Sequence, residues 1–179
     1  MTYNYRSDPI LGPALEHWIG KCGTRSMPRK RDIDPTEIPR SVLPHLQIID
    51  VIDGGARFRF RLIGSALVAA RGNDCTGKYA EEILPDDRLR LALRVYRTVC
   101  ETKAPLFSRN RYYTPRRNDL FANRIYMPLS DDGINVHHII AALVFETSGA
   151  LDDGIWGASE LDRSGQYNEP IEIGSTVAA

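Results

Sequence analysis

The chain has 179 residues, 42% of them hydrophobic and 26% charged, which is the composition of an ordinary soluble globular protein with room for one core. Lysine plus arginine number 23, as do aspartate plus glutamate, which excludes a global field that would draw the chain to nucleic acid or an anionic membrane. No apolar run is long enough to span a membrane and the start, MTYNYRSDPILG, has no secretory layout, so we expect a cytoplasmic protein without a membrane partner.

The first 45 residues are predicted to form a helix and a connector. Four apolar side chains recur at helical spacing and indicate a short amphipathic helix: Leu11, Leu15, Trp18 and Cys22. A basic connector, KCGTRSMPRKRDIDP, follows this helix. Its end, from Asp34 to Glu37, has the form of a helix start, with Asp as the cap and Pro at the first position.

Two strands are predicted from residue 46 onward. The runs LQIIDVID and RFRFRLIG flank Asp53-Gly54-Gly55, which is a hairpin signal. The second run alternates between arginine and apolar residues, so Phe58, Phe60 and Leu62 are expected to share one face of the strand. The sheet should therefore have one face on a core and the other toward solvent or an added element.

A helical insertion and three more strands complete the predicted domain. Short helical pieces in SALVAARGNDCTGKYAEEILP lead to a long amphipathic helix in DDRLRLALRVYRTVCETK. Three strands are then predicted in LFSRNRYYT, FANRIYMPL and NVHHIIAALVFET. This order predicts an α+β domain at 46–147, with a five-stranded antiparallel sheet and helices on one face. The segment 148–179 lacks periodicity and is predicted to be a disordered tail, in which Trp156 and Tyr167 are weak candidates for docking.

The stretch GNDCTGKY has the spacing of a phosphate-binding loop. Such a loop needs a small hydroxyl after its lysine to hold magnesium, and Tyr79 occupies that position here. The following AEEILP also places two acids beside the supposed phosphate site. We therefore expect a turn in which glycines permit sharp reversals and Asp74 or Thr76 satisfies backbone donors, and no ATP site.

Several of these elements together are similar to a known family. The order of two strands, helices and three strands from Leu46 to Thr147 resembles a PAS domain, a sensory module that holds small molecules or contacts partners. RDIDPTEIPRSVLPHLQIIDVI and RFRFRLIGSALVAARGNDCTGK further resemble the bacterial single-PAS proteins formerly catalogued as a domain of unknown function. The matching elements are Trp18, Pro28 to Pro35, Leu43-Pro44, Arg61 to Gly64 and Gly72 to Lys78.

The resemblance implies a fold and a sensory or interaction role, without naming a ligand. A pocket for a small organic ligand would be lined by side chains from the second strand, the helices and the later strands. The same side chains suit a filled core equally well. The candidate residues are Leu62, Leu67, Val95, Tyr96, Tyr126, His138 and Ile140.

The sequence argues against the cofactors that PAS proteins often hold. Haem-binding members supply a histidine from a pocket helix, and the long helix here has none. Flavin photosensors carry a reactive cysteine in an N-C-R-F-L-Q context, unlike Cys75 in NDCTGK. Three separated cysteines give no disulfide framework, and His137 and His138 face opposite sides of a strand, so they cannot chelate one metal together.

Two other classes of function stay open at this point. RNRYYTPRR and Arg124 supply five arginines and two tyrosines, which suit nucleic acid or an acidic protein surface, although zero net charge favours an ordinary solvated sheet face. Asp50 is the candidate for a small cup-shaped acid/base enzyme if burial raises its pKa. The alternative for Asp50 is an edge aspartate in solvent.

The N-terminal helix is the predicted element of assembly. In PAS proteins a flanking amphipathic helix packs on the sheet or pairs with another copy, and Leu11, Leu15 and Trp18 supply an apolar stripe. We expect a homodimer through this stripe. We recognise no kinase, cyclase or DNA-binding output segment, so we expect signalling by a changed partner contact or by dimerisation.

Overall fold

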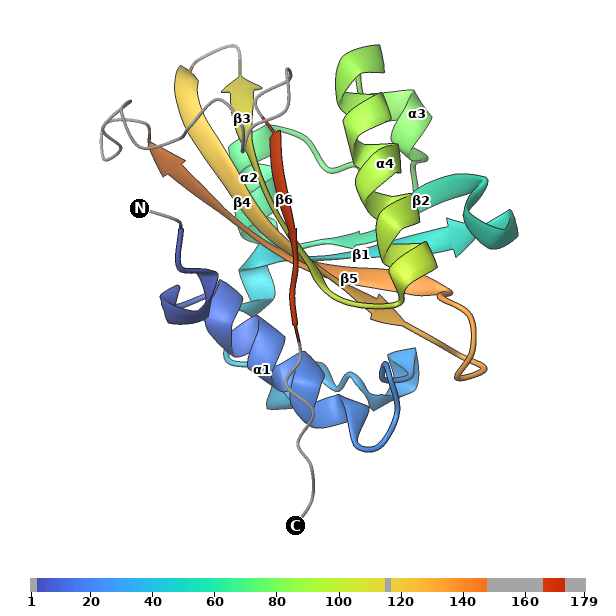
Figure 1. Ribbon diagram of the computed structural model, residues 1–179. Helices are drawn as coiled ribbons and strands as arrows, with labels where there is room; N and C mark the ends of the chain where they lie inside the picture. Colours follow the sequence, from blue (N-terminus) through green and yellow to red (C-terminus); the bar gives the residue numbers. More distant parts are fainter. Residues whose placement is uncertain (1–2, 115–116, 148–165, 173–179) are drawn as a thin grey trace.

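In the part of the chain that the structure describes, residues 3–114, 117–147 and 166–172, six antiparallel strands form one sheet (Figure 1). The structure is a computed structural model. The strands lie in the order β2-β1-β5-β4-β3-β6. Their bounds are β1 Leu46–Ile52, β2 Arg57–Ile63, β3 Leu106–Thr114, β4 Arg117–Leu129, β5 His138–Thr147 and β6 Gln166–Pro170.

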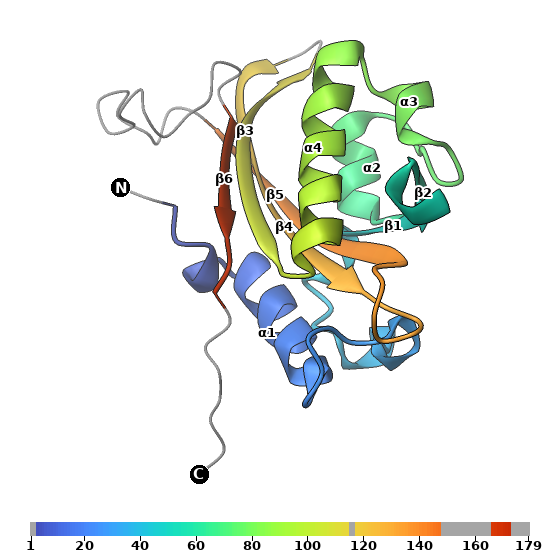
Figure 2. The same cartoon turned by 45° about the vertical axis from the view of Figure 1, so that its right-hand side comes forward.

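Helices cover both faces of this sheet, as Figures 1 and 2 show. The ring of Tyr126 on β4 packs edge-on against Tyr96 of α4 (Asp86–Thr102), with 5.6 Å between centroids. The next residue, Met127, instead lines a small pocket together with Trp18 of α1 (Leu11–Cys22). Successive side chains of a strand alternate between faces, so α4 and α1 lie on opposite sides. The helices are α1 Leu11–Cys22, α2 Ser65–Arg71, α3 Ala80–Ile83 and α4 Asp86–Thr102, with single 3₁₀ turns at Tyr5–Ser7, Lys30–Asp32, Pro35–Glu37, Leu43–His45 and Asp53–Gly55.

The predicted α+β class with an antiparallel sheet and a separate N-terminal helix is confirmed. The insertion helices α2, α3 and α4 share one face, and α1 supplies a second helical layer on the other (Figure 2). The predicted cap at the end of the connector is also present, since Asp34 Oδ1 accepts a 2.8 Å hydrogen bond from the backbone N–H of Thr36.

The apolar stripe of α1 is buried against the sheet of its own chain. Leu11, Leu15 and Trp18 are each exposed by 1% or less. Full burial of one large apolar side chain contributes about 1.5–3 kcal/mol, so this docking is a substantial part of the core. The stripe therefore leaves no surface for pairing with a second copy in this arrangement, which corrects its predicted use.

Strand β6 lies within the segment that we predicted to be disordered. It pairs with the edge of β3, from Leu106 opposite Pro170 to Asn110 opposite Gln166, and Ile171 beyond it is buried. The sheet thus has six described strands where five were predicted. A five-residue edge strand ending in proline has too little alternation to be detected, and an edge tolerates that proline. The rest of the predicted tail, with Trp156, lies outside the described residues.

A β-bulge in β2 changes the face of one predicted core residue. Ile49 pairs with Phe60, but Ile48 pairs with Leu62, so Arg61 is an extra residue in the strand. Leu62 consequently leaves the face of Phe60 and is 44% exposed, and Ile63 takes the inward position. The predicted shared face of Phe58, Phe60 and Leu62 is wrong at Leu62 for this reason.

The stretch Gly72 to Tyr79 is a turn that returns the chain to the edge of β2. Gly72 ends α2 in the left-handed conformation, with a φ of 88°. Asp74 Oδ1 accepts a 2.9 Å hydrogen bond from the N–H of Thr76, as expected. The N–H of Phe60 then donates to the carbonyl oxygen of Lys78 at 2.9 Å, which closes part of the sheet edge.

Candidate functional site

A cavity of about 140 Å³ lies between the sheet and the helices α2, α3 and α4. Its walls are mainly apolar and come from several elements that are distant in sequence, including Phe60, Leu67, Ala92, Val95 and Leu143. Polar side chains, three of them arginines, interrupt these walls. A concave space with apolar walls and polar groups at defined positions is the usual form of a small-molecule site.

Four of the seven predicted pocket residues line this cavity together. They are Leu67 of α2, Val95 and Tyr96 of α4, and Tyr126 of β4. All four side chains are buried. The structure therefore brings them into one place, and their role in binding a ligand stays a prediction.

The other three predicted pocket residues do not line it. Leu62 lies on the exposed side of the bulge. The β4–β5 register places Ala141 beside Tyr126 and Ile140 beside Met127, so Ile140 and His138 belong to the face covered by α1. This corrects the predicted set, because the pairing of β5 with β4 reverses the face that we had assigned.

Polar residues that the sequence did not assign to the pocket also line the cavity, among them Arg71, Arg88 and Arg124. Arg124 is two residues from Tyr126 on one strand, and Arg88 is four residues from Ala92 on one helix, so each pair shares a face. These spacings could have revealed both arginines. The sequence instead predicts Arg124 on a solvated sheet face or at an acidic or nucleic-acid partner, and Arg71 has no comparable signal.

The two tyrosines of the cavity remain neutral phenols. Burial raises the pKa of Tyr96 and of Tyr126, and the nearby positive charge of Arg124 lowers it less than burial raises it. Tyr96 also contacts Phe58, with 5.0 Å between ring centroids. A neutral phenol can donate a hydrogen bond or accept one, but it supplies no base at neutral pH.

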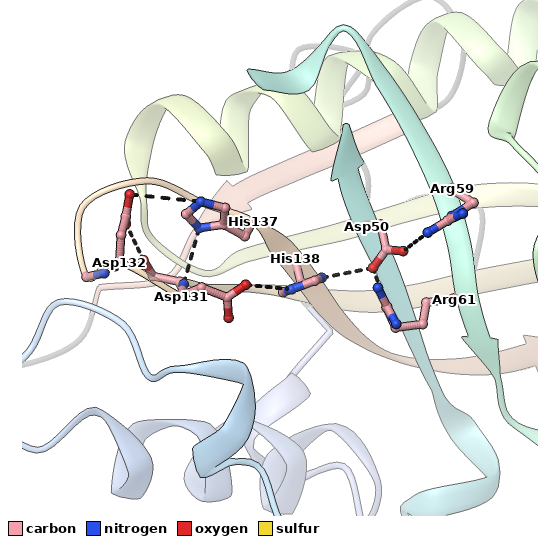
Figure 3. A network of polar contacts seen from close by, with 9 residues as sticks. Asp50, Arg59, Arg61, Asp131, Asp132, His137 and His138 are labelled. Atoms are coloured by element: carbon pink, nitrogen blue, oxygen red, sulfur yellow. Dashed lines mark hydrogen bonds and ion pairs between the residues drawn. The ribbon is translucent and has the colours of Figure 1, made fainter. Parts of the chain in front are cut away.

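Figure 3 shows a second polar cluster, the Asp50 network. It lies on the face of the sheet opposite the cavity, because Asp50 pairs with His138, which shares the face of Ile140. Asp50 is only 2% exposed, and its carboxylate accepts hydrogen bonds from Arg59 Nη2 at 2.9 Å and Arg61 Nε at 2.5 Å. His138 Nδ1 lies 2.9 Å from Asp50 Oδ1, and its Nε2 lies 3.2 Å from Asp131 Oδ2. The network ties β1, β2 and β5 together.

The geometry of Asp50 contradicts both of its predicted roles. It is buried and not an edge aspartate in solvent. Burial alone raises the pKa of the carboxyl, but hydrogen bonds from the two guanidinium groups and the imidazole outweigh it, so the pKa lies below its ordinary value. A carboxylate held ionised by two arginines is a structural anion and does not fit a general acid with a raised pKa.

A family model described as a PAS domain matches residues 10–144, which is more than half of the chain. The chain belongs to the PAS domain family. The match begins before α1 and therefore includes the N-terminal helix as well as the sheet and the cavity. No match is found among curated proteins.

The arginine- and tyrosine-rich segment of this PAS domain does not form one described surface. Arg109 is 1% exposed, and its Nη1 donates to Asn123 Oδ1 at 2.7 Å and to Glu146 Oε2 at 2.8 Å. Arg124 lines the cavity on the other face, and Arg111 is exposed. The side chains of its other arginines and of its two tyrosines lie outside the described residues. These placements do not favour a nucleic-acid surface here.

Neither a metal cluster nor a membrane span occurs in the described part of the PAS domain. Its described residues include no group of three His, Cys, Asp or Glu side chains placed to hold a metal ion. Figure 3 shows His137 directed to the loop at Asp132, whereas His138 lies between Asp50 and Asp131. None of the described helices has both the length and the apolar character needed to cross a bilayer.

Proposed function

We propose that this PAS domain is a sensory module that binds a small organic molecule in the cavity between α4 and the sheet. The observation that carries the proposal is the cavity itself, about 140 Å³ in volume and lined by apolar side chains together with arginines and other polar groups. An engineered protein cavity of about 150 Å³ holds benzene, so this space matches a ligand with one small ring or a short chain.

The position of the cavity also suits a sensor. A molecule there would contact α2, α4 and the central strands at once, because residues from all of these elements line the space. Occupancy of the cavity would therefore favour one packing of α4 over another. The exposed side of α4, which bears Arg90, Arg94 and Arg97, would then present a changed surface to a protein partner. We infer that signalling occurs through a changed protein contact of this kind.

The test is native mass spectrometry after incubation with a deproteinised small-molecule cell extract. We expect a discrete extra mass on the wild-type protein that is lost under denaturing conditions. Ala92→Phe fills the cavity and should abolish the extra mass, whereas the exposed Ala69→Phe on α2 should retain it. Circular dichroism establishes that both variants are folded. The proposal would be overturned if the wild-type protein showed no extra mass, or if the Ala92→Phe variant kept it.

A further inference from the structure

We infer that the ligand of the cavity is a small organic carboxylate, with a compact apolar body and one anionic head. This inference rests on the proposed function and adds the chemical class of the ligand. It comes from an imbalance of charge in the lining. Arg71, Arg88 and Arg124 line the cavity, and none of the described residues that line it is an aspartate or glutamate.

The three arginines come from different elements and line one space. Arg71 ends α2, Arg88 lies in the first turn of α4, and Arg124 lies on β4. The whole chain has zero formal net charge, so this concentration of positive charge is local and does not reflect a basic protein. Arginine stays protonated in proteins, so the cavity keeps this charge at any physiological pH.

Hydrogen bonds to neutral acceptors help to orient two of these arginines. Arg71 Nη2 donates to the backbone carbonyl oxygen of Ile83 at 3.4 Å, and Arg124 Nη1 donates to Asn110 Oδ1. Both acceptors are neutral. The positive charges of Arg124 and Arg71 also act on the buried Tyr96, whose pKa they lower against the larger effect of burial. Their field therefore extends into the interior of the site.

The remaining walls select for an organic anion. Apolar side chains such as Leu91, Ala92 and Val95 would gain nothing from inorganic phosphate, but they suit a ring or short alkyl chain. A guanidinium group presents parallel N–H donors that match the two oxygens of a carboxylate. Gln47, Ser108 and Asn110 also line the space and offer further polar groups. A carboxylate with a small apolar body satisfies both kinds of wall within about 140 Å³.

Matched pairs of ligands and matched variants test this inference. Isothermal titration compares benzoate with benzamide, and hexanoate with hexanamide, since each pair differs mainly in charge. We expect at least one carboxylate to bind about tenfold or more tightly than its amide, because a charge-assisted hydrogen bond is worth about 1.5–3 kcal/mol. Arg88→Gln and Arg124→Gln should each remove most of that preference.

The control is Arg90→Gln, which removes the same charge from the exposed side of the same helix as Arg88. Its effect on carboxylate affinity should stay within about twofold, as expected for a solvent-screened charge. The use of two separate arginine variants covers the case in which one of them does not fold.

The failures of the two proposals are distinguishable. Equal affinities for carboxylate and amide would overturn the inferred preference for a carboxylate and leave the cavity as a binding site. Equal losses of carboxylate affinity in Arg88→Gln and Arg90→Gln would have the same meaning. An extra mass from the cell extract with no binding of either carboxylate would likewise overturn only the ligand class. Absence of both the extra mass and any titration signal would overturn the proposed function as well.

Discussion

The indole Nε1 of Trp18 donates a 2.8 Å hydrogen bond to the backbone carbonyl oxygen of Pro128. This bond joins the middle of α1 to β4 across 110 positions of sequence, on the face of the sheet opposite the cavity. Both partners are buried. The N-terminal helix is therefore held to the PAS sheet by a directional contact in addition to apolar packing.

Trp18→Phe should destabilise the protein by about 1–3 kcal/mol, because it leaves the buried carbonyl oxygen of Pro128 without its donor. The free energy of unfolding in urea measures this change. Glu16→Gln on the exposed side of α1 is the control and should change stability by no more than about 0.5 kcal/mol. Equal stabilities of the two variants would show that α1 does not depend on this bond.

Asp50→Asn should destabilise the protein by about 2 kcal/mol or more at neutral pH, because it removes the buried anion that holds Arg59 and Arg61. The matched control is Asp87→Asn, which breaks an exposed ion pair with Arg90 and should cost less than about 1 kcal/mol. Urea unfolding of both variants at pH 7 measures the difference. A loss in Asp50→Asn no larger than in Asp87→Asn would contradict the structural role of the network.

The effect of Asp50 should also depend on pH. Its pKa is lower in the folded protein than the value of about 3.9 for an unfolded aspartate. The unfolded state therefore takes up the proton first as pH falls, so the stability from Asp50 is complete above about pH 4 and decreases below it. Unfolding curves from pH 7 to pH 3 should show wild type and Asp50→Asn converging at the acid end. A gap that widens with acid would mean that the pKa is raised instead.

Gly64→Ala and Gly20→Ala should have effects of opposite sign. A Cβ at Gly64 would lie 2.2 Å from the carbonyl oxygen of Pro44, so the backbone must shift, at a cost of about 1–3 kcal/mol. A Cβ at Gly20 in α1 meets no described atom within 4 Å, and alanine there should stabilise the helix by about 0.5–1 kcal/mol. Thermal unfolding of both variants measures these changes. A neutral Gly64→Ala would disprove the close approach of η4 (Leu43–His45) and the start of α2.

Ile171→Ala should loosen β6 from the edge of β3. Ile171 is 3% exposed, and its N–H donates to the carbonyl oxygen of Pro105 at 3.0 Å, so its side chain anchors the end of the strand. Hydrogen exchange should accelerate at Leu106–Asn110, which faces β6, and stay unchanged in the central strand β1. Unchanged exchange at the β3 edge would show that the anchor lies elsewhere.

Local periodicity in the sequence was sufficient for most elements of the fold. The predicted strand LFSRNRYYT coincides with β3, and the predicted long helix differs from α4 by one residue at its end. Both predictions depend only on one segment of sequence: strand-favouring aromatic residues after Pro105 in the strand, and a period of 3.6 in the helix. The α+β class followed from the order of these segments.

The parts that failed depend on pairing between segments. The face of Ile140 is set by its register with Met127, and the exposure of Leu62 is set by a bulge against β1. Strand β6 exists through its pairing with β3. Asp50 is buried because two arginines from β2 and a histidine from β5 converge on it. None of these relationships leaves a period in one segment of sequence.

The most direct test of the account is a titration of ¹⁵N-labelled protein with benzoate and with benzamide, followed by two-dimensional NMR. We predict that binding of either compound shifts the amide signals of Val95, Tyr96 and Tyr126, which line the cavity. The indole N–H signal of Trp18, on the opposite face, should stay unchanged. Shifts at Trp18 and Ile140 with none at the cavity would contradict the account, because they would place binding between α1 and the sheet.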